Sequence, residues 1–176
     1  MESHRLRLAV YTGSFDPITL GHLNVIQRGC RLFDKLIIGI GINVEKRPLF
    51  APAERVAMIR QVTADCGNVE VRTFTGLAVQ FVRDCGARVM IRGIRPLTDV
   101  AAEFTMMLAN RQLAHDVETI FLMADEDLAH VSSTLIKQIT PLSTDEMLTR
   151  FVPAPIIPAI RQRIPGPAVT IVDNDL

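Results

Sequence analysis

The sequence has no tryptophan, a single tyrosine and no excess of charge of either sign. Its 19 lysines and arginines balance 19 aspartates and glutamates, so the formal net charge at pH 7 is zero. A protein that binds nucleic acid needs a basic face, and this balance argues against that class. The chain of 176 residues is long enough to bury most of its apolar surface on folding.

Long hydrophobic runs are also absent, although 48% of the residues are hydrophobic. The longest pure runs, such as Leu36 to Ile42, have the length of a strand, whereas a membrane-spanning helix needs roughly 20 apolar residues. Near the N-terminus, Arg5 and Arg7 precede only a few apolar residues, so we expect no signal peptide. These absences predict a cytoplasmic protein with no membrane partner.

Cysteine is scarce. Cys30, Cys66 and Cys85 are odd in number, lie far apart and never form a C-x-x-C pair. This pattern argues against a disulfide framework and against a zinc site. Each has apolar neighbours, among which a free cysteine acts as a small hydrophobic residue, and we assign the three no catalytic role.

The sequence does contain a regular alternation of short β-rich runs and helical periodicity. Helices are predicted at about 22–33, 52–63, 77–85 and 100–114, the last with an apolar face, and they separate five predicted strands: 6–11, 35–42, 68–74, 87–91 and 118–123. This alternation indicates a parallel sheet with right-handed crossovers. The predicted fold class is α/β: a Rossmann-like, five-stranded parallel sheet with helices on both faces.

The C-terminal part is predicted to be a helical tail that wraps one flank of the sheet. Six prolines interrupt it: Pro141, Pro153, Pro155, Pro158, Pro165 and Pro167. We expect residues 165–176 to be loose, as chain ends often are. No repeat or composition shift marks a boundary, so residues 1–176 are expected to form a single domain.

Polar and cationic residues follow four of the five predicted strands. Ligands of such sheets bind outside the carboxyl ends of the strands, where these residues would meet. They comprise glycines, hydroxyls, an imidazole and cations: Gly13, Ser14, Gly21, His22, Lys46, Arg47, Arg92, Arg95, Ser132, Ser133 and Thr134. Such groups bind phosphate oxygens. Together they predict a polyphosphate site.

Most of these residues also have a simpler interpretation when taken alone. His22 can be a solvated residue at a helix start, Ser132–Thr134 can be N-caps, and Lys46 with Arg47 can be a solvated loop. Arg92 and Arg95 are harder to explain in this way, because they follow a buried strand where two guanidinium groups can chelate phosphates.

Two acidic features have no obvious phosphate chemistry. Asp16 is interpreted as a loop-forming hydrogen-bond acceptor, structural rather than catalytic. The acidic run Asp125–Asp127 receives no assignment.

The residues from Tyr11 to His22, Y-T-G-S-F-D-P-I-T-L-G-H, resemble the signature of the nucleotidyltransferase superfamily, which carries G-[ST]-F-D-P and T-x-G-H. Three further segments resemble the bacterial phosphopantetheine adenylyltransferase family: I-R-G-I-R at 91–95, N-R at 110–111 and V-S-S-T-L-I-K at 131–137. The resemblance extends from about residue 6 to residue 160.

This resemblance implies adenylyl transfer from ATP to 4′-phosphopantetheine, which gives 3′-dephospho-CoA and pyrophosphate in coenzyme A biosynthesis. It implies direct in-line displacement with Mg²⁺ as the cofactor. His22 would stabilise the transition state, and Ser14, Lys46 and Arg92 would complete the catalytic set. No side chain is assigned to the metal, because Mg²⁺ commonly takes most of its ligands from substrate phosphates and water.

The resemblance also implies binding residues and partners. The ATP-binding residues would be Ser14, Phe15, His22, Gly93, Ile94, Arg95, Glu103, Leu128, Ala129, His130, Val131, Ser132, Ser133 and Thr134. The phosphopantetheine-binding residues would be Ser14, Lys46, Leu77, Ala78 and Arg92. Dephospho-CoA and CoA are implied as further ligands, and a homohexamer as the assembly.

Two segments depart from the family pattern. Where relatives usually carry D-F-E-Y-E, this chain has Asp99–Glu103, with Ala102 in place of the tyrosine. Where relatives often carry W-S-F-I, it has Leu128–Val131. Both segments are expected near the adenosine, so nucleotide affinity or feedback by CoA is expected to differ.

Two alternatives remain open at this point. The chain can be another nucleotidyltransferase, such as a nicotinate-mononucleotide adenylyltransferase or a cytidylyltransferase, although I-R-G-I-R and V-S-S-T-L-I-K favour the pantetheine enzyme. It can also be a non-catalytic module that senses nucleotides or CoA. His22 and Lys46 argue against the sensor, which has no need of groups that stabilise a transition state.

Overall fold

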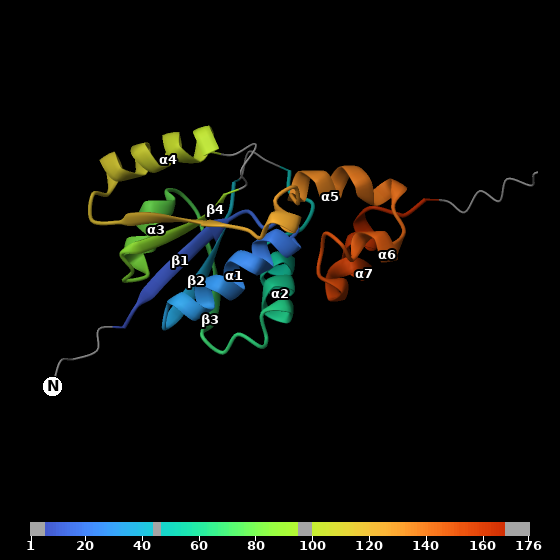
Figure 1. The fold of residues 1–176 in the computed structure, drawn as a ribbon, viewed down its shortest axis with the longest axis horizontal. Coiled ribbons are helices and arrows are strands. Elements are labelled where there is room, and N and C mark those ends of the chain that lie inside the picture. Colours follow the sequence, from blue (N-terminus) through green and yellow to red (C-terminus); the bar gives the residue numbers. More distant parts are fainter. Residues whose placement is uncertain (1–5, 44–46, 95–99, 168–176) are drawn as a thin grey trace, which may run out of the picture.

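The computed structural model describes residues 6–43, 47–94 and 100–167. Its centre is a sheet of five parallel strands in the order β3-β2-β1-β4-β5 (Figure 1). The strands are β1 (Leu8–Gly13), β2 (Lys35–Gly41), β3 (Val69–Phe74), β4 (Val89–Ile94) and β5 (Glu118–Met123). The predicted α/β, Rossmann-like fold is confirmed.

Strand β2 shows why these segments form such a sheet. Leu36, Ile37, Ile38 and Ile40 are all at most 1% exposed, because helices cover both faces of the strand. A strand buried on both faces reads as a continuous apolar run, which is how this segment stands out in the sequence.

Strand β4 begins two residues later and ends three residues later than the predicted strand at 87–91. It begins at Val89 and continues to Ile94, and Arg92 pairs with Phe121 while Gly93 pairs with Leu122. Arg92 and Gly93 therefore lie within the strand and not in a loop after it. The sequence does not reveal the pairing with β5. This pairing extends the strand through Arg92 and Gly93, although neither residue favours a strand by itself.

Helices cover both faces of the sheet, as predicted. On one face, α1 (Leu20–Leu32) and α2 (Pro52–Val62) contribute Ile26 and Ile59 to the larger apolar cluster. On the other, α3 (Ala78–Asp84) contributes Val79 and Val82 to the smaller cluster. Side chains of β1 alternate between the two, with Val10 in the smaller cluster and Tyr11 in the larger.

Helix α4 (Val100–Leu113) lies beside β5, where Phe104 stacks on Phe121 with ring centroids 5.1 Å apart. The helix buries only Asn110, although its sequence predicts an apolar face. Phe104 is 45% exposed and Leu108 is 59% exposed. Most of that apolar face is therefore left uncovered in the single chain.

The C-terminal part forms short helices that close one flank, as predicted. They are η1 (Glu126–Leu128), α5 (Ser133–Ile139), η2 (Thr140–Leu142), α6 (Asp145–Leu148), η3 (Ala154–Ile156) and α7 (Ile157–Arg163). Ile136, Leu148 and Ile160 join the same apolar cluster as α1 and α2. Most of the predicted loose end, from residue 168 on, lies outside the described residues, and the single-domain assignment stays a prediction.

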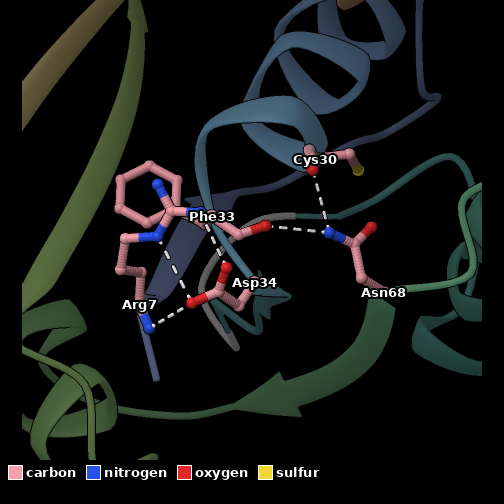
Figure 2. Close-up of polar contacts among 5 residues, drawn as sticks. All are labelled: Arg7, Cys30, Phe33, Asp34 and Asn68. Atoms are coloured by element: carbon pink, nitrogen blue, oxygen red, sulfur yellow. Dashed lines mark hydrogen bonds and ion pairs between the residues drawn. The ribbon is translucent and has the colours of Figure 1, made fainter. Parts of the chain in front are cut away.

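Polar contacts stabilise the end of the sheet where β1, β2 and β3 begin (Figure 2). Asn68 Nδ2 donates to the carbonyls of Cys30 and Phe33, at 2.9 Å each, where α1 ends. The backbone N–H of Arg7 donates to Asp34 Oδ2 at 2.8 Å, and its guanidinium Nη2 donates to Asp34 Oδ1 at 2.7 Å. These contacts fix the junction between α1 and β2.

The three cysteines are free and partly buried. Burial, together with the neighbouring Cys66, raises the pKa of Cys30 to about 12, so this thiol stays protonated. No helix among the described residues is both long and apolar enough to cross a membrane.

Candidate active site

A cavity of about 260 Å³ lies at the carboxyl ends of β1, β4 and β5. The starts of α1 and α5 complete its wall. Its lining residues come from four parts of the chain: Tyr11, Thr12, Gly13, Ser14, Thr19, Gly21, His22 and Val25; Arg92, Gly93 and Ile94; Glu103; and Ala124, Leu128, Val131, Ser132, Ser133 and Thr134. This is the sheet edge at which the sequence predicts a phosphate site.

Most of the predicted site residues meet in this cavity. Those that line it are Ser14, His22, Arg92, Gly93, Ile94, Glu103, Leu128, Val131, Ser132, Ser133 and Thr134. Five described ones do not: Phe15 is buried, and Leu77, Ala78, Ala129 and His130 are absent from the lining. Lys46 and Arg95 lie outside the described residues.

Thr19 holds the imidazole of His22 at the start of α1. The backbone N–H of Thr19 donates to His22 Nδ1 at 3.2 Å, the Thr19 hydroxyl lies 3.0 Å from the same nitrogen, and the backbone N–H of His22 donates back to that hydroxyl at 3.3 Å. Because an N–H donates to Nδ1, this nitrogen is the acceptor, and the ring hydrogen is assigned to Nε2. The ring of His22 is therefore held in place by Thr19, with Nε2 as its donor nitrogen.

Phe15 supports this histidine from the side. Its ring lies edge-on to the ring of His22, with centroids 5.1 Å apart, and edge-on to Tyr11, at 5.2 Å. Phe15 has a φ of +48°, a conformation that few non-glycine residues adopt. A Cβ on Gly13 would lie only 2.9 Å from its ring, so glycine is needed where the loop folds over Phe15.

Asp16 is buried below the same loop and acts as the structural acceptor predicted from the sequence. Its carboxylate accepts hydrogen bonds from the backbone N–H groups of Leu49 and Phe50, at 2.8 and 2.9 Å, and from Lys137 Nζ at 2.7 Å. Burial raises the pKa of Asp16, but the hydrogen bond from Lys137 and those from the backbone outweigh it and lower the pKa. Asp16 thus ties three distant segments together.

Arg92 reaches the cavity from β4 and is held on two sides. Its Nε and Nη2 donate to the two carboxylate oxygens of Glu103, at 2.7 and 2.6 Å. Its Nη1 donates to the carbonyl of Thr12 at 2.9 Å. Next to it, a Cβ on Gly93 would lie 2.9 Å from the Tyr11 hydroxyl, so only glycine lets β4 pass the tyrosine this closely.

The hydroxyls at the start of α5 have structural partners. Ser132 is the N-cap, since its Oγ accepts from the backbone N–H of Leu135 at 3.0 Å. Ser133 Oγ donates to the carbonyl of Pro17 at 2.8 Å. The N-cap interpretation holds for Ser132, and Ser133 fastens α5 to the Ser14–Pro17 loop.

Sequence reasoning missed three residues around the site. Arg55 donates from Nη1 to the carbonyl of Ser14 at 2.8 Å, and Lys137 pairs with Asp16. Asp125, the first residue of the unassigned acidic run, accepts from Asn24 Nδ2 at 2.6 Å and so ties the end of β5 to α1. Arg55 carried a signal, because helical spacing places it on the face of Met58 and Ile59, and Lys137 ends the V-S-S-T-L-I-K segment, which by itself gave it no role.

Among the described residues, no group of three or more His, Cys, Asp or Glu side chains could hold a metal ion. The cavity lining includes one carboxylate, that of Glu103, which is engaged by Arg92. Such a lining suits a hydrated cation carried by phosphates better than one caged by the protein.

Comparisons with known proteins agree with the fold and the motifs. Residues 10–139 match the cytidylyltransferase-like family. The chain is 60% identical over 163 residues to a phosphopantetheine adenylyltransferase of Rhodopirellula baltica, covering 92% of this chain and 91% of that protein. It is 47% identical over 138 residues to a phosphopantetheine adenylyltransferase of Geotalea daltonii, covering 78% of this chain and 86% of that protein.

A solved structure shares the fold at low sequence identity. It is the nicotinic acid mononucleotide adenylyltransferase of Plasmodium falciparum, which superposes with a TM-score of 0.60 over 90% of this chain and 96% of that one. At 12% identity, this likeness concerns the fold alone.

Proposed function

The chain belongs to the phosphopantetheine adenylyltransferases of the cytidylyltransferase-like family, and on that premise we propose that it joins ATP and 4′-phosphopantetheine. The products are 3′-dephospho-CoA and pyrophosphate, and the reaction is a step of coenzyme A biosynthesis. The observation that carries this proposal is the 60% identity over nearly the whole chain. The cavity that gathers Ser14, His22 and Arg92 supports it.

The reaction proceeds by direct displacement at the α-phosphorus of ATP. An oxygen of the phosphopantetheine phosphate forms the new bond, and the bond from the α-phosphorus to the bridging oxygen breaks, so pyrophosphate leaves. The attacking phosphate is already a nucleophile at neutral pH, and little acid–base work remains. Catalysis then rests on alignment and on donors that stabilise charge at the α-phosphate.

His22 is the donor for that charge. Its hydrogen on Nε2 bonds to an α-phosphate oxygen as negative charge builds up there, while Thr19 keeps the ring in place. Because the ring is fixed beforehand, its orientation costs nothing at the moment of reaction.

The remaining predicted residues divide between the two substrates. Arg92 and Lys46 hold the phosphopantetheine phosphate, Ser14 contacts both substrates at the reacting phosphates, and Leu77 with Ala78 lines the pantetheine arm. Gly93 and Ile94 at the end of β4 contact ATP, together with Phe15, Arg95, Glu103 and Leu128–Thr134. Arg92 supports this division, because its guanidinium is fixed at the cavity by Glu103 and Thr12.

Mg²⁺ is the proposed cofactor. It neutralises the charge of the triphosphate and of the leaving pyrophosphate when it is bound. Its ligands are phosphate oxygens and water, in keeping with a cavity whose one lining carboxylate is engaged by a guanidinium.

The proposed assembly is a homohexamer in the cytoplasm, with CoA as a further ligand. The exposed apolar side chains of α4 support association with further copies: Phe104, Met106, Leu108 and Leu113 are 45–59% exposed. A soluble monomer seldom leaves such a face uncovered.

Pyrophosphate release tests the function. The purified protein receives ATP and Mg²⁺ with 4′-phosphopantetheine or with nicotinate mononucleotide, and in a third reaction CTP with phosphocholine. We expect release with phosphopantetheine only. Release with another acceptor assigns the chain to another nucleotidyltransferase reaction, and no release in any reaction indicates a sensor.

A further inference from the structure

Arg55 is a buried arginine whose guanidinium is only partly hydrogen-bonded in the described structure. It lies on α2 and is 3% exposed, yet no carboxylate among the described residues forms a salt bridge with it. Its Nη1 donates to the carbonyl of Ser14 at 2.8 Å, while its buried Nε has no hydrogen-bond partner in the described structure. Burying a guanidinium in this way is costly, so its retention needs a reason.

Among the described residues, the guanidinium of Arg55 donates to the backbone carbonyl of Ser14, which belongs to the wall of the cavity. Ser14 lines the cavity, whereas Arg55 is absent from the lining. The peptide bond between Ser14 and Phe15 is trans, so its C=O and N–H point in opposite directions. If Arg55 binds the carbonyl of Ser14 on the side away from the cavity, the N–H of Phe15 is directed toward the cavity.

The conformation of Phe15 agrees with this role. A φ of +48° is the left-handed conformation that makes successive backbone N–H groups converge in anion-binding loops. Phe15 as a whole residue is 1% exposed, and its ring is held against Tyr11 and His22. The ring and Arg55 thus fix the two sides of the same peptide group.

We propose that Arg55 is a positioning residue, which holds the Ser14 carbonyl so that the N–H of Phe15 faces the substrate phosphates. Its charge is then balanced by the phosphates of the bound substrate, through the peptide group that separates them. The inference rests on the proposed function in one respect, since it takes the anion to be a phosphate of ATP or of the leaving pyrophosphate. Arg55 itself touches neither substrate.

The sequence allows this peptide to be observed alone. Of the eight phenylalanines, only Phe15 follows a serine. Labelling serine with ¹³C at the carbonyl and phenylalanine with ¹⁵N gives one NMR correlation, that of the Ser14–Phe15 peptide. The probe is inorganic pyrophosphate, and the variants are Arg55→Met, Arg55→Lys and, as a matched control, Arg60→Met, which alters an exposed arginine of the same helix.

In the unaltered protein, pyrophosphate is expected to shift the Phe15 amide signal. Arg55→Met is expected to shift the Ser14 carbonyl signal without ligand and to weaken pyrophosphate binding by at least about 10-fold, the usual effect of losing a charge-assisted contact. Arg55→Lys retains the charge but not the planar guanidinium. Its affinity for pyrophosphate is expected to lie between those of the unaltered protein and of Arg55→Met. Arg60→Met is expected to behave as the unaltered protein.

Two results would overturn the inference: a Phe15 amide that does not respond to pyrophosphate, or a folded Arg55→Met protein with unaltered affinity. Urea denaturation shows whether each variant is folded. If Arg55→Met does not fold, Arg55→Lys decides, since unaltered affinity there contradicts the proposal and weaker affinity supports it. The NMR measurement does not require turnover. If the protein fails the release assay but its Phe15 amide responds to pyrophosphate, the proposed function is contradicted and the role of Arg55 is supported.

Discussion

Glu103 of α4 binds the guanidinium of Arg92 of β4 through both carboxylate oxygens, at 2.6 and 2.7 Å. The two side chains are 19% and 27% exposed, so the pair is largely shielded from water. A planar guanidinium held along one edge keeps a fixed direction, which a single contact would not give. The structure thus joins a residue predicted to bind ATP to one predicted to bind the other substrate.

Glu103→Gln tests which substrate this pair serves. The amide keeps the size of the side chain but carries no negative charge. It has one acceptor oxygen, so it cannot accept both hydrogen bonds from Arg92 as the carboxylate does. We expect the KM for 4′-phosphopantetheine to rise by about 10-fold, and the KM for ATP to change much less. Steady-state kinetics with each substrate varied in turn measures this split.

Glu118→Gln, at an exposed position on β5, is the matched control and should leave both constants unaltered. A rise confined to the KM for ATP would show that Glu103 acts on the nucleotide, as the family resemblance implies, and not through Arg92.

Replacing His22 by alanine is expected to lower kcat by about 100- to 1000-fold, since one donor to the transition state is lost. ATP binding, measured by calorimetry, is expected to persist. His22→Gln places an N–H near the position of Nε2 and is expected to recover part of the rate. His115→Ala, an exposed histidine, is the control, and near-native turnover of His22→Ala would reject the role.

Asp16 is expected to make the stability of the protein depend on pH in the acid range. Its pKa is lower in the folded protein than its ordinary value of 3.8, because the hydrogen bonds from Lys137, Leu49 and Phe50 outweigh the effect of burial. A carboxyl with a lowered pKa stabilises the fold above its unfolded pKa, and this contribution is lost as the pH falls through the folded value.

The comparison with Asp16→Asn isolates that contribution. At neutral pH the variant is expected to be less stable by about 1–3 kcal/mol, and the difference is expected to shrink below about pH 4. Urea denaturation at a series of pH values measures it. The exposed Asp65→Asn is the control, and a difference that stays constant down to about pH 3 would contradict the assignment.

Asn68→Asp is expected to destabilise the fold without affecting the site. The substitution removes the amide that donates to the carbonyls of Cys30 and Phe33 and brings a negative charge toward them. We expect a loss of about 1–3 kcal/mol in the free energy of unfolding, with kcat unaltered. Gln162→Glu, the same change at an exposed position, is the control, and an equal effect there would argue against a stabilising role of the two hydrogen bonds from Asn68.

The fold was predictable because its signals are local. The apolar run of β2 and the proline at the start of α2 each identify an element from a few neighbouring residues. Strand β4 was harder, since Arg92 and Gly93 become part of a strand only by pairing with β5. The apolar face of α4 was predicted, but its exposure in the single chain was not.

The candidate site divides in the same way. Its motif residues were identifiable because Ser14 and His22 lie in one short segment, and Thr19 fixes His22 from three residues away. Arg55 lies 41 residues from Ser14, and Lys137 lies 121 residues from Asp16. Only the folded chain reveals such pairs.

The sequence by itself determined the order of strands and helices, the family motifs and the sheet edge where phosphates are expected, because short-range periodicity and turn chemistry encode these. The tertiary structure alone decided how the site groups are held. Arg92 is directed by Glu103, and the Ser14–Pro17 loop rests on Arg55 and on the pair of Asp16 and Lys137. The physical reason is that charge pairing depends on distance in space, and the parallel sheet brings together segments that are far apart along the chain.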